Sequence, residues 1–451
     1  MQEAPEALVR VVLRLQETLV EVRAALSQVR QELAEMKDQN RPPSAPHRRR
    51  EDERKAHPKK PGRPPGHEGS CRRVPAHLDE AVEVPLTACP QCQGAVTDVL
   101  PVVQWIEELP EVRPHVTKLT TYEAHCPRCQ CWVRSTHPRQ TSTAGGCAGV
   151  QLGARALALA AELKHGLGLT LSKTQRALQM LGGLRVSPGG LALAFQRIAQ
   201  RLEPEQQRLH RQLLAAPVVH SDETSWWVNG PQSLWVFTTP GPEPLTLYYV
   251  VPHRDRMTFH GILPATWDGL LITDCLSVYD TATDRQHKCF AHHLKALRAA
   301  RLAQSPEVAA AEPWVERAHQ FFTDAMALKQ RWADLVPATR NAQRQTLAHT
   351  AQQLFAQPRA DPAQESFRAR IAKQFDHLLA FLDEPLAAAT NNLAERQLRP
   401  AVIARKLSCG NKTTRGAWAW QTLTSFTATC AQRAQDFVGF LSPRLFLFPK
   451  G

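Results

Sequence analysis

The sequence predicts a multidomain protein in which an α/β core with a helical insertion follows a coiled coil, a zinc-binding unit and a helical domain. Three observations support this prediction: a seam of apolar residues near the N-terminus, two Cys-x-x-Cys pairs, and short apolar strands that end in aspartate. A chain of 451 residues is too long for one ordinary core and suits about two to four domains.

The composition favours an anionic partner. The chain has 55 Lys and Arg residues against 42 Asp and Glu, a formal charge of +13, and nucleic acid is a commoner partner than membrane for such a chain. No apolar run approaches the ~18 residues of a membrane span, and no export signal is visible. We therefore expect a cytoplasmic protein, in which the clustering of cysteines between Cys71 and Cys147 indicates a metal site rather than disulfides.

Residues 1–39 are predicted to form a coiled-coil helix. Apolar side chains recur there in steps of four and three residues, the seam typical of paired helices: Leu8, Val12, Leu15, Leu19, Val22, Leu26, Val29, Leu33 and Met36. We expect this helix to join copies of the chain into a homo-oligomer. A helix packed on its own domain is the alternative.

Residues 40–78 are predicted to be an extended linker, because prolines and like charges keep a chain solvated. The Gly62-Arg63-Pro64 core of this segment is similar to an AT-hook, in which an extended Arg enters a narrow minor groove. Arg63 is therefore a candidate DNA contact, and a plain flexible linker is the alternative interpretation.

Two Cys-x-x-Cys turns predict a zinc-binding domain over 79–140, because each turn presents two thiolates toward one tetrahedral Zn²⁺ ion. The four predicted ligands are Cys89, Cys92, Cys126 and Cys129. Cys131 and His125 are rivals for the fourth position. We expect the β-prone runs 102–106 and 116–122 to form a hairpin that brings the turns together. A redox pair or unrelated buried thiols are the alternatives.

Residues 150–204 are predicted to be helical, with a first helix near 152–163, a second after Thr170 and a third after the break at 187–190. Three short helices joined by glycine-containing turns are typical of a helix-turn-helix DNA-binding domain. A packing bundle without any contact to DNA fits the sequence equally well, so both interpretations stay open.

The region from 215 to 303 is predicted to be the first part of the core. Its β-prone runs form first a meander and then alternate with helix, which is typical of an α/β sheet. The runs are 217–222, 233–238, 245–251, 269–274 and 287–290. Asp222 and Asp274 end two of them, and paired carboxylates on neighbouring strands suit Mg²⁺ or Mn²⁺. For either aspartate alone, capping of a helix or turn is the alternative.

Residues 304–385 are predicted to be a helical insertion, because they lack strand patterns and are rich in Ala, Gln and Arg. We expect the core to resume at 386–440. A helix begins there near Thr390, and Glu395 falls within its first two turns.

Several motifs together resemble one family. They are His220-Ser221-Asp222-Glu223-Thr224-Ser225-Trp226, Thr273-Asp274 with Tyr279 following, Cys289-Phe290-Ala291-His292, and Asn391 to Pro400 with Arg405-Lys406 beyond. In these motifs, and in its N-terminal coil, Pro65 to Gly69 run and cysteine pairs, the chain is similar to transposases of the insertion sequence 66 family. It departs from that family in having Thr390 in place of Asp, a loose match at 407–411, and an unusual Gly-Arg-Pro-Pro in the linker.

The resemblance implies a ribonuclease-H-like core in which Asp222, Asp274 and Glu395 form an Asp-Asp-Glu triad that holds Mg²⁺ or Mn²⁺. It implies an enzyme that binds the ends of an insertion element, hydrolyses DNA strands and joins the 3′-hydroxyl ends to target DNA, with the two-metal chemistry of in-line phosphoryl displacement. Small accessory proteins of the same element are expected partners, no membrane is involved, and the expected location is the nucleoid of a bacterial cytoplasm.

Four cations on and beyond the Glu395 helix are candidates for contacts to DNA phosphates: Arg396, Arg399, Arg405 and Lys406. Surface solvation or pairing with acidic neighbours is the alternative for them. Two other functions also stay open on the sequence alone. One is a metal-dependent nuclease without strand transfer, and the other is a non-catalytic, zinc-containing DNA-binding regulator.

Overall fold

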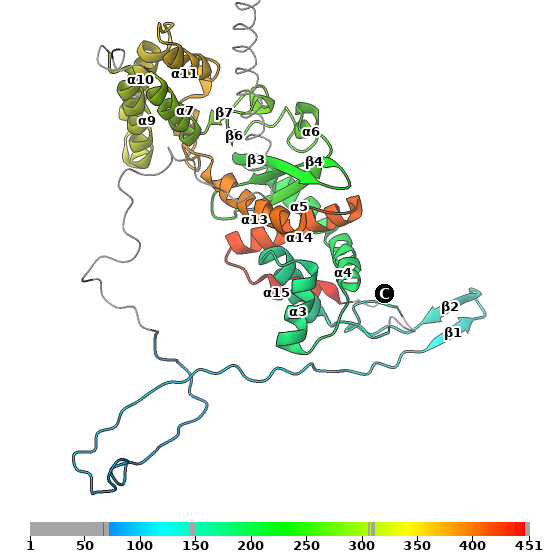
Figure 1. Cartoon of the computed structure of the whole chain (residues 1–451). Coiled ribbons are helices and arrows are strands. Elements are labelled where there is room, and N and C mark those ends of the chain that lie inside the picture. Colours follow the sequence, from blue (N-terminus) through cyan, green and yellow to red (C-terminus); the bar gives the residue numbers. More distant parts are fainter. Residues whose placement is uncertain (1–65, 67–71, 145–148, 305–306, 308–311, 447–451) are drawn as a thin grey trace, which may run out of the picture. The chain divides into compact units, whose positions relative to one another are not determined.

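The computed structural model describes residues 66, 72–144, 149–304, 307 and 312–446, which fall into one unit ending at Arg113 and a second beginning at Pro114 (Figure 1). The predicted coiled coil 1–39 lies outside the described residues, and so does most of the linker, including Arg63. Among the helices of the described segments, none is both long enough and apolar enough to cross a bilayer.

A five-stranded mixed sheet forms the centre of the second unit. Its strand order is β5–β4–β3–β6–β7; β4 runs antiparallel to its neighbours β5 and β3, whereas β3, β6 and β7 run parallel to one another. The strands are β3 (Val218–Trp227), β4 (Pro231–Thr238), β5 (Thr246–Val251), β6 (Leu270–Thr273) and β7 (Gln286–Lys288). The predicted mixed α/β core is therefore confirmed, and each β-prone run overlaps one strand.

The connections between strands explain why one half of the sheet is antiparallel and the other half is parallel. Asn229 at φ 48° and Gly230 at φ 151° make the tight turn between β3 and β4, because both residue types tolerate a positive φ. The longer segment after β5, which contains α6 (Arg256–His260), returns the chain to the far side of β3, as a parallel neighbour requires.

Helix α14 (Thr414–Gln432) covers the outer edge of the sheet, where β5 would otherwise leave every second N–H group without a partner. Two strand residues span about 6.8 Å and four helix residues about 6.0 Å, so side chains four apart on α14 match alternate residues of β5. Three N–H groups of β5 donate to them: Thr246 to Thr429 Oγ1 (3.0 Å), Tyr248 to Ser425 Oγ (2.9 Å) and Val250 to Gln421 Oε1 (2.8 Å). This pairing explains why the hydroxyl side chains of Ser425 and Thr429 are buried.

The helices that follow residue 150 share one hydrophobic core with the sheet. They are α2 (Ala154–Ala161), a π-helical turn (Glu162–Gly166), α3 (Leu171–Gly182), α4 (Pro188–Arg201) and α5 (Glu203–Leu214). Thr170 and Ser187 cap α3 and α4. Helix α4 buries Leu191 and Ile198 in the cluster that also contains Trp235 of β4. One side of α4 therefore packs against the hydrophobic core. A contact between DNA and the other faces of α4 stays a prediction.

A second group of helices lies between β7 and the final part of the chain (Figure 1). It consists of α7 (Phe290–Ala303), α9 (Trp314–Gln330), α10 (Pro337–Phe355), α11 (Pro362–Ala372) and α12 (Ala380–Asp383). Phe290, Phe322 and Phe355 belong to its core, which also takes in Val218 of β3. Helix α13 (Asn392–Ser408) then packs on β3 and β4, and α15 (Phe437–Leu441) follows α14.

The hairpin expected from 102–106 and 116–122 is wrong, because the described segment from 72 to 122 contains no strand. Val102 and Val116 are more than four-fifths exposed, so these runs bury no apolar face that would hold a hairpin together. The hairpin lies further along the chain, where β1 (Glu123–Cys126) and β2 (Cys131–Arg134) flank the second Cys-x-x-Cys turn.

Gly410 closes the loop after α13 against the end of β3. Its φ is 96°, and a Cβ at this position would lie 2.4 Å from the carbonyl oxygen of Trp227. The same oxygen accepts the N–H of Asn411 at 2.9 Å, and the side chain of Asn411 accepts the indole N–H of Trp226 at 2.9 Å. The loop therefore needs a residue without a side chain.

We predict that Gly410→Ala lowers the free energy of unfolding by about 2 kcal/mol or more, because it combines a left-handed φ with a backbone clash. Thermal unfolding of the full chain measures the effect. Gly189→Ala in α4 is the matched control, since no atom lies within 4 Å of a Cβ there, and it should be neutral or slightly stabilising. Equal melting temperatures for the two variants would contradict the prediction.

Candidate functional site

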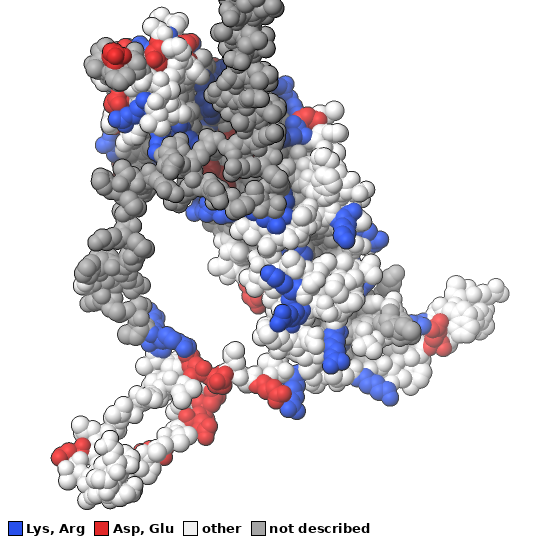
Figure 2. All heavy atoms as spheres, in the orientation of Figure 1, with Lys and Arg blue, Asp and Glu red and all other residues white. Residues whose placement is uncertain are grey.

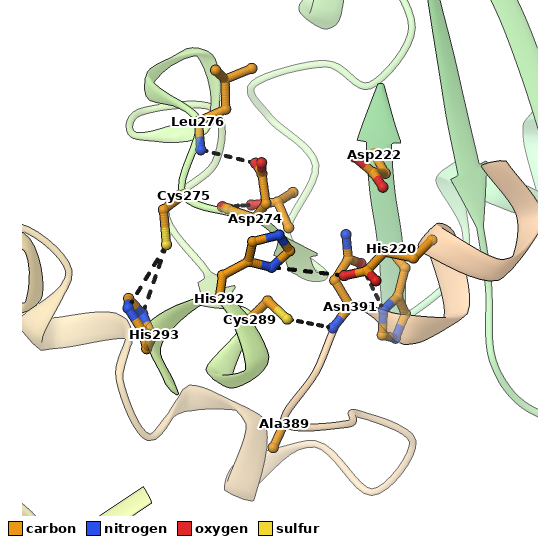
Figure 3. Close-up of polar contacts among 12 residues, drawn as sticks. His220, Asp222, Asp274, Cys275, Leu276, Cys289, His292, His293, Ala389 and Asn391 are labelled. Atoms are coloured by element: carbon orange, nitrogen blue, oxygen red, sulfur yellow. Dashed lines mark hydrogen bonds and ion pairs between the residues drawn. The ribbon is translucent and has the colours of Figure 1, made fainter. Parts of the chain in front are cut away.

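Asp274 directly follows β6, whereas Asp222 lies in the middle of β3, just beyond the part of β3 that pairs with β6; the strand that was expected to end at Asp222 continues to Trp227. In the β3–β6 pair, His220 lies opposite Ile272, and each aspartate comes two residues later. Oδ1 of Asp222 accepts the N–H of Glu223 at 2.9 Å. Oδ1 of Asp274 accepts the N–H of Leu276 at 2.9 Å (Figure 3).

The surroundings of Asp222 disfavour its ionised form in the absence of a cation. Burial is the main cause, and the neighbouring carboxylates of Glu223, Asp274 and Glu395 add to it, so the pKa of Asp222 rises to about 7. Clustered carboxylates of this kind need a proton or a cation between them. The site therefore has the electrostatic character of a divalent-metal site.

Asn391 fastens the start of α13 to the sheet. Its Nδ2 donates to the carbonyl oxygen of Ser221 at 2.8 Å, and its Oδ1 lies 3.2 Å from Nδ1 of His220. Its backbone N–H donates to Sγ of Cys289 at 3.1 Å, and its carbonyl oxygen accepts the N–H of Glu395 at 3.1 Å. These bonds bring the first turn of α13, and Glu395 with it, to the part of β3 that directly precedes Asp222.

The three predicted triad residues thus gather around one region, but they are not in mutual contact. Asp274 and Glu395 both act electrostatically on Asp222. Within the described part of the chain, one set of three ligand atoms that all lie within 4.8 Å of one another belongs to Cys289, His292 and Glu395 instead. The carboxylates come from β3, the end of β6 and α13.

No pattern in the sequence assigns a role to Glu223 beyond its place in the first motif. Its buried carboxylate accepts hydrogen bonds from the Tyr279 hydroxyl and from Nη2 of Arg254. Burial raises the pKa of Glu223, and the bond from Tyr279 partly offsets this. Adjacent strand residues point to opposite faces of a sheet. This alternation was the one sequence signal that Glu223 and Asp222 lie on different faces of β3.

Lys288 is a second functional candidate that the sequence did not indicate. It is buried at the end of β7, and its Nζ donates to Oγ1 of Thr273 at 3.2 Å, directly before Asp274. Burial lowers the pKa of Lys288 to about 8, while nearby acidic groups, Asp274 among them, oppose this shift. Lys288 therefore places its ammonium group on the buried side of the candidate site, next to the residue that precedes Asp274.

The four cations predicted to contact DNA differ in their surroundings. Arg396, Arg399 and Lys406 are exposed on α13, and Figure 2 shows further Lys and Arg side chains spread over one face of the molecule. Arg405 is half-buried, and its Nη1 donates to Oγ1 of Thr224 at 2.9 Å. A phosphate contact by Arg405 would compete with this bond, which ties α13 to β3.

The two Cys-x-x-Cys turns have the same backbone conformation. In each, the residue after the second cysteine has a positive φ (Gln93 61°, Gln130 54°), and its N–H donates to the carbonyl of the first cysteine at 2.8 Å. Backbone N–H groups also bond the first thiol and lower the pKa of Cys89 and Cys126. Thiolates are the form that binds metal. The two turns belong to different units, so one shared zinc ion stays a prediction.

We predict that Asn391→Ala loosens the start of α13, because it leaves the buried carbonyl of Ser221 without its donor at a cost of about 1–3 kcal/mol. Hydrogen exchange of the first turn of α13 measures this loosening as faster exchange. Asn392→Ala is the matched control, since Asn392 is exposed and should leave exchange unchanged. Equal exchange in both variants would rule out the clamp.

A family model described as the transposase IS66 family matches residues 149–419, which is more than half of the chain. The match includes the sheet, both aspartates and the whole of α13 with Glu395. A comparison with curated proteins gave no match. By the extent of the family match, the chain belongs to the IS66 family of transposases.

Proposed function

We propose that this protein is a DNA transposase that binds the ends of its element, cleaves DNA strands and joins the 3′-hydroxyl ends to target DNA. Family membership implies a DNA-processing enzyme with DNA as its partner. The observation that supports the finer statement is the convergence of Asp222, Asp274 and Glu395 from three separate elements, with mutual repulsion that a cation relieves. A mixed sheet with aspartates on adjacent parallel strands also supports a ribonuclease-H-like core.

The donor set fits hard divalent cations, because Mg²⁺ and Mn²⁺ prefer carboxylate oxygens. Asp222, Asp274 and Glu395 would hold these ions, which supply activation of the attacking oxygen and stabilisation of the leaving oxygen in phosphoryl displacement. Asn391 positions Glu395, and Lys288 balances part of the negative charge from behind. Arg396, Arg399 and Lys406 are exposed along α13, the helix that carries Glu395, and would bind DNA phosphates in a salt-dependent manner.

We expect Asp222→Asn, Asp274→Asn and Glu395→Gln each to reduce Mg²⁺-dependent cleavage of element ends by more than about a hundredfold, because each removes a charged metal ligand. Binding of the same DNA should persist, which is measured by gel shift. Asp268→Asn is the matched control, an exposed acid shortly before β6. Normal cleavage by the triad variants would refute the assignment.

A strand-transfer assay distinguishes a transposase from a nuclease without strand transfer. The assay supplies pre-cut element ends with free 3′-hydroxyls, target DNA and any accessory proteins of the element. A transposase joins these ends to the target, whereas a nuclease leaves them unjoined. The triad variants distinguish a transposase from a regulator, because a non-catalytic DNA-binding protein would function normally without these carboxylates.

We also propose that Cys89, Cys92, Cys126 and Cys129 bind a structural Zn²⁺ ion. The supporting observation is that both turns direct N–H groups at a thiol and share one backbone conformation. We expect serine at any of the four positions to remove one equivalent of tightly bound zinc, measured by elemental analysis. Cys131→Ser should retain it. If Cys131→Ser loses zinc and Cys129→Ser retains it, the fourth zinc ligand is Cys131 instead of Cys129.

The assembly and location follow from the same proposal. The apolar seam of residues 1–39 would join copies of the chain, and accessory proteins of the element would complete the complex on DNA. Such an enzyme acts where the chromosome is, in the nucleoid of a bacterial cytoplasm.

A further inference from the structure

Three different kinds of metal ligand meet beside the proposed magnesium site. The ligand atoms of Cys289, His292 and Glu395 all lie within 4.8 Å of one another. Nδ1 of His292 and Oε1 of Glu395 are 3.8 Å apart. Of the three side chains, the proposed chemistry uses Glu395 alone.

The combination of sulfur, nitrogen and oxygen ligands favours Zn²⁺ over Mg²⁺, because thiolate and imidazole suit the softer ion. Around a tetrahedral zinc ion with bonds of about 2.0–2.3 Å, ligand atoms are separated by roughly 3.4–3.6 Å. The 3.8 Å separation between His292 and Glu395 is only slightly longer. Small rotations of side chains would therefore close the cluster around an ion.

Two further observations point to an ion at this place. Nδ1 of His292 is buried, yet it has no hydrogen-bond partner. Sγ of Cys289 is also buried and lies at the N-terminal end of the 14-residue helix α7, where it accepts the N–H of Asn391 at 3.1 Å. A helix N-terminus and an N–H donor both favour a thiolate, whereas burial acts in the opposite direction and raises the pKa of Cys289. The cluster thus offers an imidazole nitrogen without a hydrogen-bond partner beside a buried sulfur atom and a carboxylate.

We propose that Cys289, His292 and Glu395 form a zinc-selective site that is distinct from the magnesium site but shares Glu395 with it. The side chains of His292 and Glu395 are each 36% exposed, so the ion has a path from solvent. Bound Zn²⁺ would hold the Glu395 carboxylate on the Cys289 side, away from Asp222 and Asp274. Zinc would therefore inhibit the enzyme, a consequence that rests on the proposed function, whereas the binding site itself does not.

The binding site is tested by equilibrium dialysis of the full-length protein against micromolar Zn²⁺ in millimolar Mg²⁺. We expect Cys289→Ser and His292→Ala each to bind one zinc equivalent fewer than the unsubstituted chain. Cys275→Ser is the matched control, a half-buried cysteine outside the cluster, and should bind the full number. His292→Ala guards against a folding defect in Cys289→Ser, because His292 is partly exposed and circular dichroism reports any loss of structure.

Unchanged zinc binding in folded His292→Ala would overturn the proposal. So would loss of the same equivalent in Asp222→Asn, because the zinc would then occupy the magnesium site. Replacing zinc by Co²⁺ gives a second readout, since a thiolate ligand adds a charge-transfer absorption band. That band should shrink in Cys289→Ser and persist in Cys275→Ser, and an unchanged band in Cys289→Ser would exclude sulfur ligation.

The inhibition is tested by the ratio of Mg²⁺-supported DNA cleavage with and without micromolar Zn²⁺, measured within each variant. The unsubstituted chain should lose most of its cleavage, and His292→Ala should keep the same rate with and without zinc, whatever that rate is. Equal inhibition of both proteins would overturn the inhibitory role. Absence of any Mg²⁺-supported cleavage would instead count against the proposed function and leave the zinc-binding result standing.

Discussion

The candidate site depends on the buried side chain and backbone of Asn391. This one residue bonds the backbone of β3, the sulfur that precedes α7 and the first turn of α13. A buried amide is costly when its donors and acceptors are unpaired, and here each finds a partner. The position of Glu395 relative to the sheet therefore follows from hydrogen bonds rather than from apolar packing alone.

The same region joins the two ends of the segment that contains helices α7 to α12. In sequence, 120 residues separate Asp274 from Glu395, and most of them belong to helices α7 to α12. The chain nevertheless returns to where it left, because the carbonyl oxygen of Ala389 accepts the N–H of Phe290 at 2.9 Å and lies 3.1 Å from Nε2 of His287. This helical segment can thus be long without displacing α13, since its two ends are bonded to each other.

The sequence was most informative about local elements. Short β-prone runs indicated the strands, and Thr170 and Ser187 indicated two helix starts, because these signals act between neighbouring residues. The hairpin expected at 102–122 failed because β-propensity does not specify whether a strand finds a surface to cover. The zinc turns, the coiled coil and the DNA contacts are still predictions.

Relations between distant side chains were beyond the reach of local patterns. His292 meets Glu395 across 103 positions, and Arg405 bonds Thr224 across 181. Nothing in the spacing of such residues reveals that they meet, because the sheet and the returning insertion set those distances. The resemblance to a family indicated Asp222, Asp274 and Glu395. It did not predict that Glu223 bonds Tyr279 or that Lys288 bonds Thr273 next to Asp274.

The covering of β5 by α14 restricts how this protein can associate with others. A bare edge strand recruits foreign strands, as in amyloid growth and in partners that bind by β-augmentation. Here the hydroxyl and amide groups of Thr429, Ser425 and Gln421 already occupy the N–H groups that such a guest strand would need. A second chain that binds this protein must therefore use a surface other than this edge of the sheet.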